Sequence, residues 1–70
     1  MRRYKIAIQI GKRIRRVRKK RGMTQEGAAE KAKIHVSTLG RIERGESNPP
    51  IQTISRIAYA LGVKVKELLS

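Results

Sequence analysis

The sequence predicts an all-α fold, a compact bundle of about five short helices. Apolar residues recur at helical spacing in several separate segments. Glycine or proline stands at the boundaries between these segments, where helices commonly begin and end. A chain of 70 residues has room for one small hydrophobic core and for no second domain.

The first helix is expected over residues 10–21, closed by Gly22. One apolar stripe is formed by three aliphatic residues at i, i+4 and i+7: Ile10, Ile14 and Val17. The other faces carry Lys or Arg. Residues 4–10 alternate apolar and polar like a strand, yet their isoleucines also keep helical spacing with Ile14. We therefore expect residues 1–9 to be an arm or a helical extension ahead of a domain over 10–70.

A second helix is expected over residues 25–32. Thr24 is a good N-cap, and Glu26 lies in the first turn, where the helix dipole favours a carboxylate. Gly27 weakens this helix by about 1 kcal/mol relative to alanine. Its inward positions carry small residues that let another helix approach closely: Ala28, Ala29 and Ala32.

A break at residues 33–35 precedes a third helix over about 36–44, with Leu39 and Ile42 facing inward and Gly45 as the C-cap. The "ESNPP" segment that follows has the composition of a loop.

A fourth helix is expected to begin near Pro50 and to stop at Gly62. It directs five residues inward: Ile51, Ile54, Ile57, Ala58 and Leu61. The last segment, "VKVKELLS", predicts one or two helical turns. Three of its residues are expected to fold back on the core: Val63, Leu68 and Leu69.

The formal net charge of +13 indicates an anionic partner, because such a surface otherwise repels itself. Nucleic acid is the first candidate, and a solvated basic surface without a specific partner is the alternative. Tyr4 and Tyr59 are the only aromatic residues, too few to form a stacking platform for single strands. The composition therefore favours contact with the backbone of a duplex.

Several functional classes are disfavoured by what the sequence lacks. It has no Cys, no Asp and a single His, which leaves no set of residues for a metal site or for metal-assisted catalysis. We expect no enzymatic activity and no cofactor. No apolar run is long enough to span a membrane or to act as a signal peptide, so the cytoplasm is the expected location.

Two helices joined by a tight break, one lined with alanines and the next with larger aliphatics, are typical of a steep helix-helix crossing. The stretch "TQEGAAEKAKIHVSTLGRIERG", with the later "ISRIAYALGV", resembles the helix-turn-helix domain of the Cro and phage lambda-repressor type, the XRE family. The resemblance covers residues 10–69, with its motif at about 25–44. It implies a lambda-repressor-like bundle of five helices, which usually acts as a two-fold dimer. The third helix would enter the major groove of a near-palindromic operator.

The resemblance also implies roles for individual residues. Four match base-facing positions: Val36, Ser37, Thr38 and Arg41. Four match positions at DNA phosphates: Gln25, His35, Arg44 and Asn48. A guanidinium can bind guanine O6 and N7 in a bidentate manner, so Arg41 is the strongest candidate for reading sequence. The alternatives are that Arg41 is only a solvated helix residue and that Ser37 only caps the helix. His35 is interpreted as a turn residue near phosphate, without a catalytic role.

The sequence departs from the family pattern at several positions. Lys33 stands where the family favours a glycine with positive φ, so the turn is either strained by about 1 kcal/mol or different in geometry. Ala28 replaces a usual Leu, which weakens the expected packing of the second helix. Gly40, in the middle of the third helix, either lets DNA approach closely or is a simple weakness.

Glu43 and Arg18 are expected to form a structural ion pair. Glu43 extends the inward stripe of the third helix four residues after Leu39, and Arg18 extends that of the first helix four residues after Ile14. Both charges should therefore flank one core, and the family resemblance independently implies the same pairing. The alternative is a surface carboxylate that only lowers local repulsion.

The sequence thus predicts a small transcriptional regulator that binds double-stranded DNA and is controlled by its own concentration through dimerisation. Apolar residues left over for dimer contacts are Tyr59, Val63, Val65 and Leu69. An antitoxin-like protein-interaction module is the alternative from another class. A cationic helix acting on membranes is disfavoured, because several segments carry compatible inward stripes.

Overall fold

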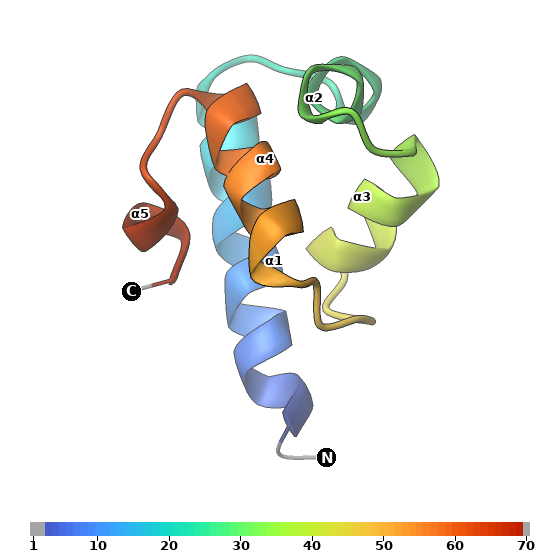
Figure 1. Ribbon diagram of the computed structural model, residues 1–70, viewed down its shortest axis with the longest axis vertical. Helices are drawn as coiled ribbons and strands as arrows, with labels where there is room; N and C mark the ends of the chain where they lie inside the picture. Colours follow the sequence, from blue (N-terminus) through green and yellow to red (C-terminus); the bar gives the residue numbers. More distant parts are fainter. Residues whose placement is uncertain (1–2, 70) are drawn as a thin grey trace.

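The computed structural model describes residues 3–69 and contains five α-helices and no strand within them. They are α1 (Arg3–Lys20), α2 (Gln25–Ala32), α3 (Val36–Glu43), α4 (Ile51–Leu61) and α5 (Val65–Leu69). In Figure 1, α2 and α3 lie on one side of the pair formed by α1 and α4, and α5 lies on the other side. The predicted all-α bundle of five short helices is confirmed.

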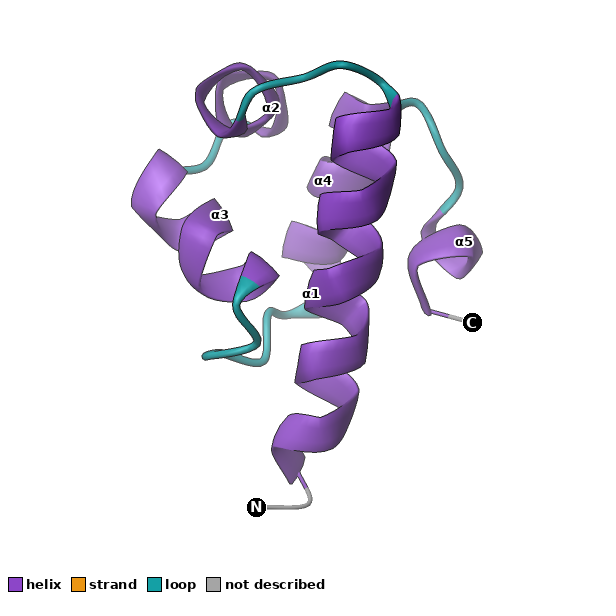
Figure 2. Cartoon of the chain, turned by 180° about the vertical axis from the view of Figure 1, so that it is seen from behind, coloured by secondary structure: helices purple, strands orange, loops and turns teal. Residues whose placement is uncertain are grey.

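The longest helix, α1, begins at Arg3, so the described residues that precede Ile10 form a helical extension and no strand. Ala7 and Ile10 are buried on its inner side, whereas Ile6 is 63% exposed. The first turns of α1 reach beyond the ends of the other helices (Figure 2). Residues 1, 2 and 70 lie outside the described part of the chain.

The break between α2 and α3 is a tight turn through Lys33. The hydroxyl of Thr24 caps the start of α2 by accepting a hydrogen bond from the backbone N–H of Gly27 at 3.0 Å. At the other end Lys33 adopts the left-handed conformation, with φ 60° and ψ 45°. The backbone N–H of Ile34 then bonds the carbonyl oxygen of Ala29 at 3.0 Å. The turn was expected to be either strained at Lys33 or different in geometry, and the positive φ of Lys33 shows that it is strained.

The core draws side chains from all five helices, and its most buried large side chains are Ile14, Leu39, Ile42, Ile57 and Leu68. The small inner face of α2, formed by Ala28, Ala29 and Ala32, is buried against the same core. Two expectations about this core are wrong. Ile51 is 59% exposed and Leu69 is 43% exposed, because each stands at the end of a short helix that reaches past the core.

Candidate nucleic-acid interface

The outer side of α3 is a solvent-facing surface opposite a buried inner side. Leu39 and Ile42 are buried at 1% exposure, while Val36, Ser37 and Arg41 are exposed and Thr38 is half-buried. This division follows from helical periodicity, because the two sets of positions lie on opposite faces of one helix. The four expected base-facing residues thus share one accessible side of a helix whose other side is fixed in the core.

A shallow open hollow of about 430 Å³ lies along this outer side. It is lined by residues of α2 and α3 and by the residue that follows α3: Gln25, Val36, Ser37, Gly40, Arg41 and Arg44. Gly40, a buried residue of α3, forms part of its floor. A Cβ atom there would lie 3.2 Å from Nη1 of Arg44. The hollow brings the expected phosphate contacts Gln25 and Arg44 next to the expected base contacts.

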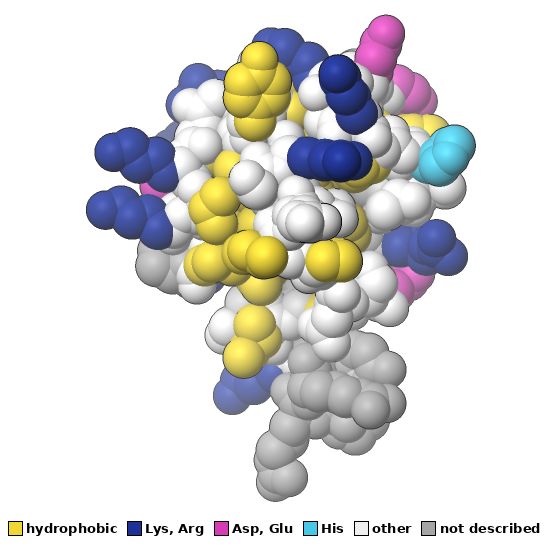
Figure 3. Space-filling model, in the orientation of Figure 1, with side chains coloured by type: hydrophobic (Ala, Val, Ile, Leu, Met, Phe, Trp, Pro, Cys, Tyr) yellow, Lys and Arg dark blue, Asp and Glu magenta, His cyan; other side chains and the backbone are white. Residues whose placement is uncertain are grey.

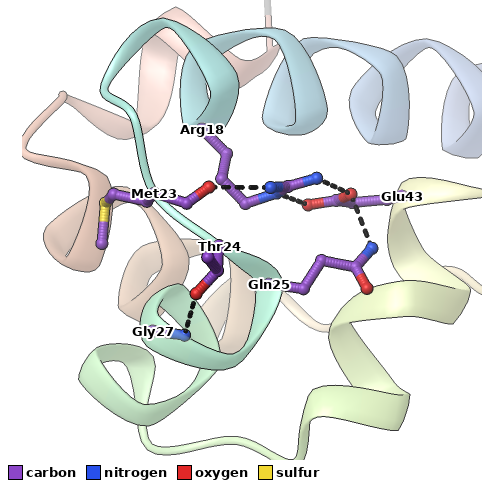
Figure 4. A network of polar contacts seen from close by, with 6 residues as sticks. All are labelled: Arg18, Met23, Thr24, Gln25, Gly27 and Glu43. Atoms are coloured by element: carbon purple, nitrogen blue, oxygen red, sulfur yellow. Dashed lines mark hydrogen bonds and ion pairs between the residues drawn. The ribbon is translucent and has the colours of Figure 1, made fainter.

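Behind this surface, Arg18 of α1 and Glu43 of α3 form the buried ion pair that the sequence suggested (Figure 4). Nε of Arg18 donates to Oε2 of Glu43 at 2.7 Å, and Nη2 donates to Oε1 at 3.0 Å. The two side chains are 10% and 1% exposed. Nη1 of Arg18 also donates to the carbonyl oxygen of Met23 at 2.8 Å. The carboxylate of Glu43 therefore links the end of α3 to α1.

Gln25 joins this network from the start of α2. Its Nε2 donates to Oε1 of Glu43 at 2.9 Å, so three helices meet at a single carboxylate (Figure 4). Within the described residues, every buried side-chain nitrogen and oxygen has a hydrogen-bond partner. The hydrogen bond to Glu43 thus holds the side chain of Gln25 at the edge of the hollow.

Arg44 follows α3 as its C-cap, so the helix ends one residue earlier than the expected range of 36–44. Its Nε donates to Oε2 of Glu46 at 2.8 Å, and its Nη2 lies 3.3 Å from Oε1. The hydrogen bond from Arg44 lowers the pKa of Glu46, and the positive charges of Arg44 and Arg41 act in the same direction. The same hydrogen bond raises the pKa of Arg44.

Sequence reasoning missed Glu46. The pairing depends on Gly45, which turns the chain with a φ of 76° and so brings residues 44 and 46 to the same side. The only signal for this pair in the sequence is "RGE", in which opposite charges flank a glycine. Such charged neighbours occur in many exposed loops, so the signal has low specificity.

The remaining expected phosphate contacts lie at the two ends of the surface. His35 is exposed and occupies the N-cap position of α3, without a side-chain capping hydrogen bond. Asn48 is exposed in the loop before α4, beside a second hollow that also borders Thr38, Arg41 and Glu46. The structure therefore distributes the eight expected contact residues along α3 and both of its flanks.

Two further features of residues 3–69 bear on function. They contain no group of three or more His, Cys, Asp and Glu side chains placed to hold a metal ion. Among their helices, none combines the length and the apolar character needed to cross a membrane.

A helix-turn-helix family model matches residues 14–68, which include the motif, α4 and most of α5. The chain belongs to the XRE-type helix-turn-helix family. Its relatives include the immunity repressor protein of Bacillus phage phi105, which is 42% identical over 62 residues. That match covers 89% of this chain but only 43% of the phage protein, so the chain spans less than half of that relative.

Other XRE-type relatives are similar in length to the chain. The control protein C.BamHI of Bacillus amyloliquefaciens is 37% identical over 65 residues, which cover 91% of this chain and 80% of that protein. The crystal structure of the restriction-modification controller protein C.AhdI from Aeromonas hydrophila has a TM-score of 0.87 and 32% identity. The overlap covers 89% of this chain and 94% of C.AhdI, so the likeness extends over most of both chains.

Proposed function

We propose that the protein is a sequence-specific, double-stranded DNA-binding regulator of transcription. Its recognition helix, α3, would occupy the major groove of a near-palindromic operator. One observation carries the proposal: α3 presents an accessible polar side while Glu43, at its end, is held from behind by the buried guanidinium of Arg18. A rigid helix presented in this way can hold side chains against base edges.

The roles of the residues follow from their chemistry. Arg41 would bind guanine, Ser37 and Thr38 would exchange hydrogen bonds with base edges, and Val36 would contact a thymine methyl group. The flanking set would bind phosphates: Gln25, His35, Arg44 and Asn48. The net charge of +13 supports this assignment, because it attracts any duplex before specific contacts form.

We also propose that the protein acts as a homodimer, in the cytoplasm with its DNA. Figure 3 shows hydrophobic side chains gathered on the face that carries α4 and α5. Three large hydrophobic residues of α4 and α5 are exposed: Ile51 at 59%, Tyr59 at 78% and Leu69 at 43%. Val63 and Val65, also expected at the dimer contact, are half-buried against the protein's own core, so the three exposed residues are the stronger candidates.

Selection of bound duplexes from a random pool tests the proposed function. We expect a consensus made of two related half-sites. The affinity for this consensus should fall about 10³- to 10⁵-fold between 50 and 200 mM salt if a dimer makes 6–10 phosphate contacts. The preference over a scrambled duplex should persist at each salt concentration. A pool without any enriched sequence would reject sequence-specific binding.

An antitoxin-like protein-interaction module is the second candidate, favoured by the exposed apolar residues of α4 and α5. Light scattering during size-exclusion chromatography separates the two possibilities. A dimer mass together with an enriched consensus supports the regulator, whereas a monomer without a consensus supports the interaction module.

A further inference from the structure

The carboxylate of Glu46 occupies the part of Arg44 that a DNA phosphate would use. Nε and Nη2 form one bidentate edge of the guanidinium, and both point to the two oxygens of Glu46, at 2.8 and 3.3 Å. A phosphate also presents two oxygens to such an edge. The remaining terminal nitrogen, Nη1, lies over Gly40 at the floor of the hollow. Before DNA binds, Arg44 is therefore already engaged by an anion.

This ion pair is suited to exchange because solvent surrounds it. The side chain of Arg44 is 56% exposed and that of Glu46 is 51% exposed. Exposed pairs are weakly held, since water and salt screen the attraction. The Arg18–Glu43 pair, with side chains 10% and 1% exposed, is the opposite case and serves as a fixed support.

Glu46 also places a negative charge beside residues that are proposed to contact DNA. The hydrogen bond from Arg44 and the charge of Arg41 lower its pKa, so the carboxylate stays ionised near neutral pH. It borders the hollow that contains Thr38, Arg41 and Asn48, all of which are proposed DNA contacts. One of only five carboxylates in a chain with eighteen Lys and Arg thus lies on the surface that would meet phosphates.

We infer that Glu46 is an internal competitor for DNA phosphate. It holds the guanidinium of Arg44 in the free protein, must release it when a phosphate binds there, and so limits the affinity for duplex DNA. This inference rests on the proposed function, because it presumes that the outer side of α3 and its flanks bind a duplex. The opposite assignment, in which Glu46 orients Arg44 towards phosphate, predicts the opposite sign for its removal.

The test compares Glu46→Gln with Glu30→Gln, measured on the selected duplex and on a scrambled duplex. Both variants remove one negative charge from an exposed side chain, but Glu30 lies on α2 and lines neither hollow beside α3. Glu46→Gln should bind both duplexes about two- to fivefold more tightly than Glu30→Gln, the range set by an exposed ion pair. Its plot of log affinity against log salt should be steeper by up to about one unit.

A double-mutant cycle identifies Arg44 as the group that Glu46 occupies. In an Arg44→Ala background, the tightening by Glu46→Gln relative to Glu30→Gln should become smaller, because the part that comes from releasing Arg44 is lost and only the relief of direct repulsion between Glu46 and DNA remains. Equal or weaker binding by Glu46→Gln, in a protein whose unmodified form binds duplex DNA, would overturn the inference and leave the proposed function intact. Absence of duplex binding by the unmodified protein would overturn both. Circular dichroism of each variant checks that the helices are retained.

Discussion

Gly11 of α1 lies directly against the backbone carbonyl of Ile42, near the end of α3. A Cβ atom added to Gly11 would overlap that oxygen and would lie 2.9 Å from the carbonyl oxygen of Glu43. The two helices can cross this closely only because residue 11 has no side chain. The same crossing brings the C-terminal end of α3 within reach of Arg18. Gly11 is thus a structural condition for the proposed interface, although it makes no contact with DNA in the proposal.

Gly11→Ala should destabilise the protein by about 1–3 kcal/mol, the usual cost of forcing an atom into a packed contact. Backbone atoms form the obstacle, so no side-chain rotation relieves it. Thermal unfolding followed by circular dichroism measures the effect. The control is Gly27→Ala, where the nearest atom to the added Cβ is the hydroxyl oxygen of Thr24 at 3.2 Å. Equal melting temperatures for Gly11→Ala and the unmodified protein would contradict the close approach.

Glu43→Ala should cost about 3–5 kcal/mol, because it leaves the guanidinium of Arg18 buried without its carboxylate. That loss is on the order of the entire stability of a domain of this size. The double variant Arg18→Met, Glu43→Leu should recover much of the loss, since apolar residues of similar volume can replace a buried pair. Urea unfolding of both variants measures the difference. A melting temperature unchanged by Glu43→Ala would remove the support assigned to this pair.

Arg41→Ala should weaken binding to the selected duplex by about 1–3 kcal/mol and relax the base preference at one position of each half-site. Binding to scrambled duplex should change much less. Arg56→Ala is the matched control, because it removes the same charge from an exposed position on α4. Competition binding at fixed salt measures both variants. Equal losses for the two would mean that Arg41 contributes charge only and reads no base.

Lys33→Gly should stabilise the protein by up to about 1 kcal/mol. The left-handed conformation of Lys33 costs about 1–2 kcal/mol for a residue with a side chain, and the greater flexibility of unfolded glycine offsets part of the gain. The melting temperature should rise by a few degrees. Lys31→Gly removes the same charge from inside α2 and should instead destabilise by about 1 kcal/mol. A loss of stability in Lys33→Gly would contradict strain at this turn.

The pKa of Glu46 should lie below the ordinary value of a glutamate and should rise towards it in Arg44→Ala. Because folding lowers this pKa, the Arg44–Glu46 pair stabilises the protein above the unfolded pKa. This contribution is lost as the pH falls through the folded pKa. A titration of the glutamate side-chain carbon signal by NMR measures both values without any DNA. An identical pKa in the two proteins would show that the pair does not form in solution.

Local pattern alone determined the number and order of the helices and most of their inner faces. Stripes such as Ile10, Ile14 and Val17 require a helix to be buried on one side, and Thr24 and Gly62 mark ends by the hydrogen bonds and backbone angles they favour. The Arg18–Glu43 pair could be predicted for the same reason, since each charge extends an apolar stripe. These features depend on neighbours three or four residues away, which the sequence displays directly.

Only the tertiary structure decided the features that depend on distant residues. By pattern, residues 4–10 fit a strand or a helix. In the structure they are helical, and they contact distant parts of the chain, as Ile8 does beside Gly45. Ile51 and Leu69 continue inward stripes, yet the core ends before it reaches them. The engagement of Arg44 by Glu46 depends on the turn at Gly45. Periodicity defines a face along one helix, but where that face is covered depends on how the helices cross.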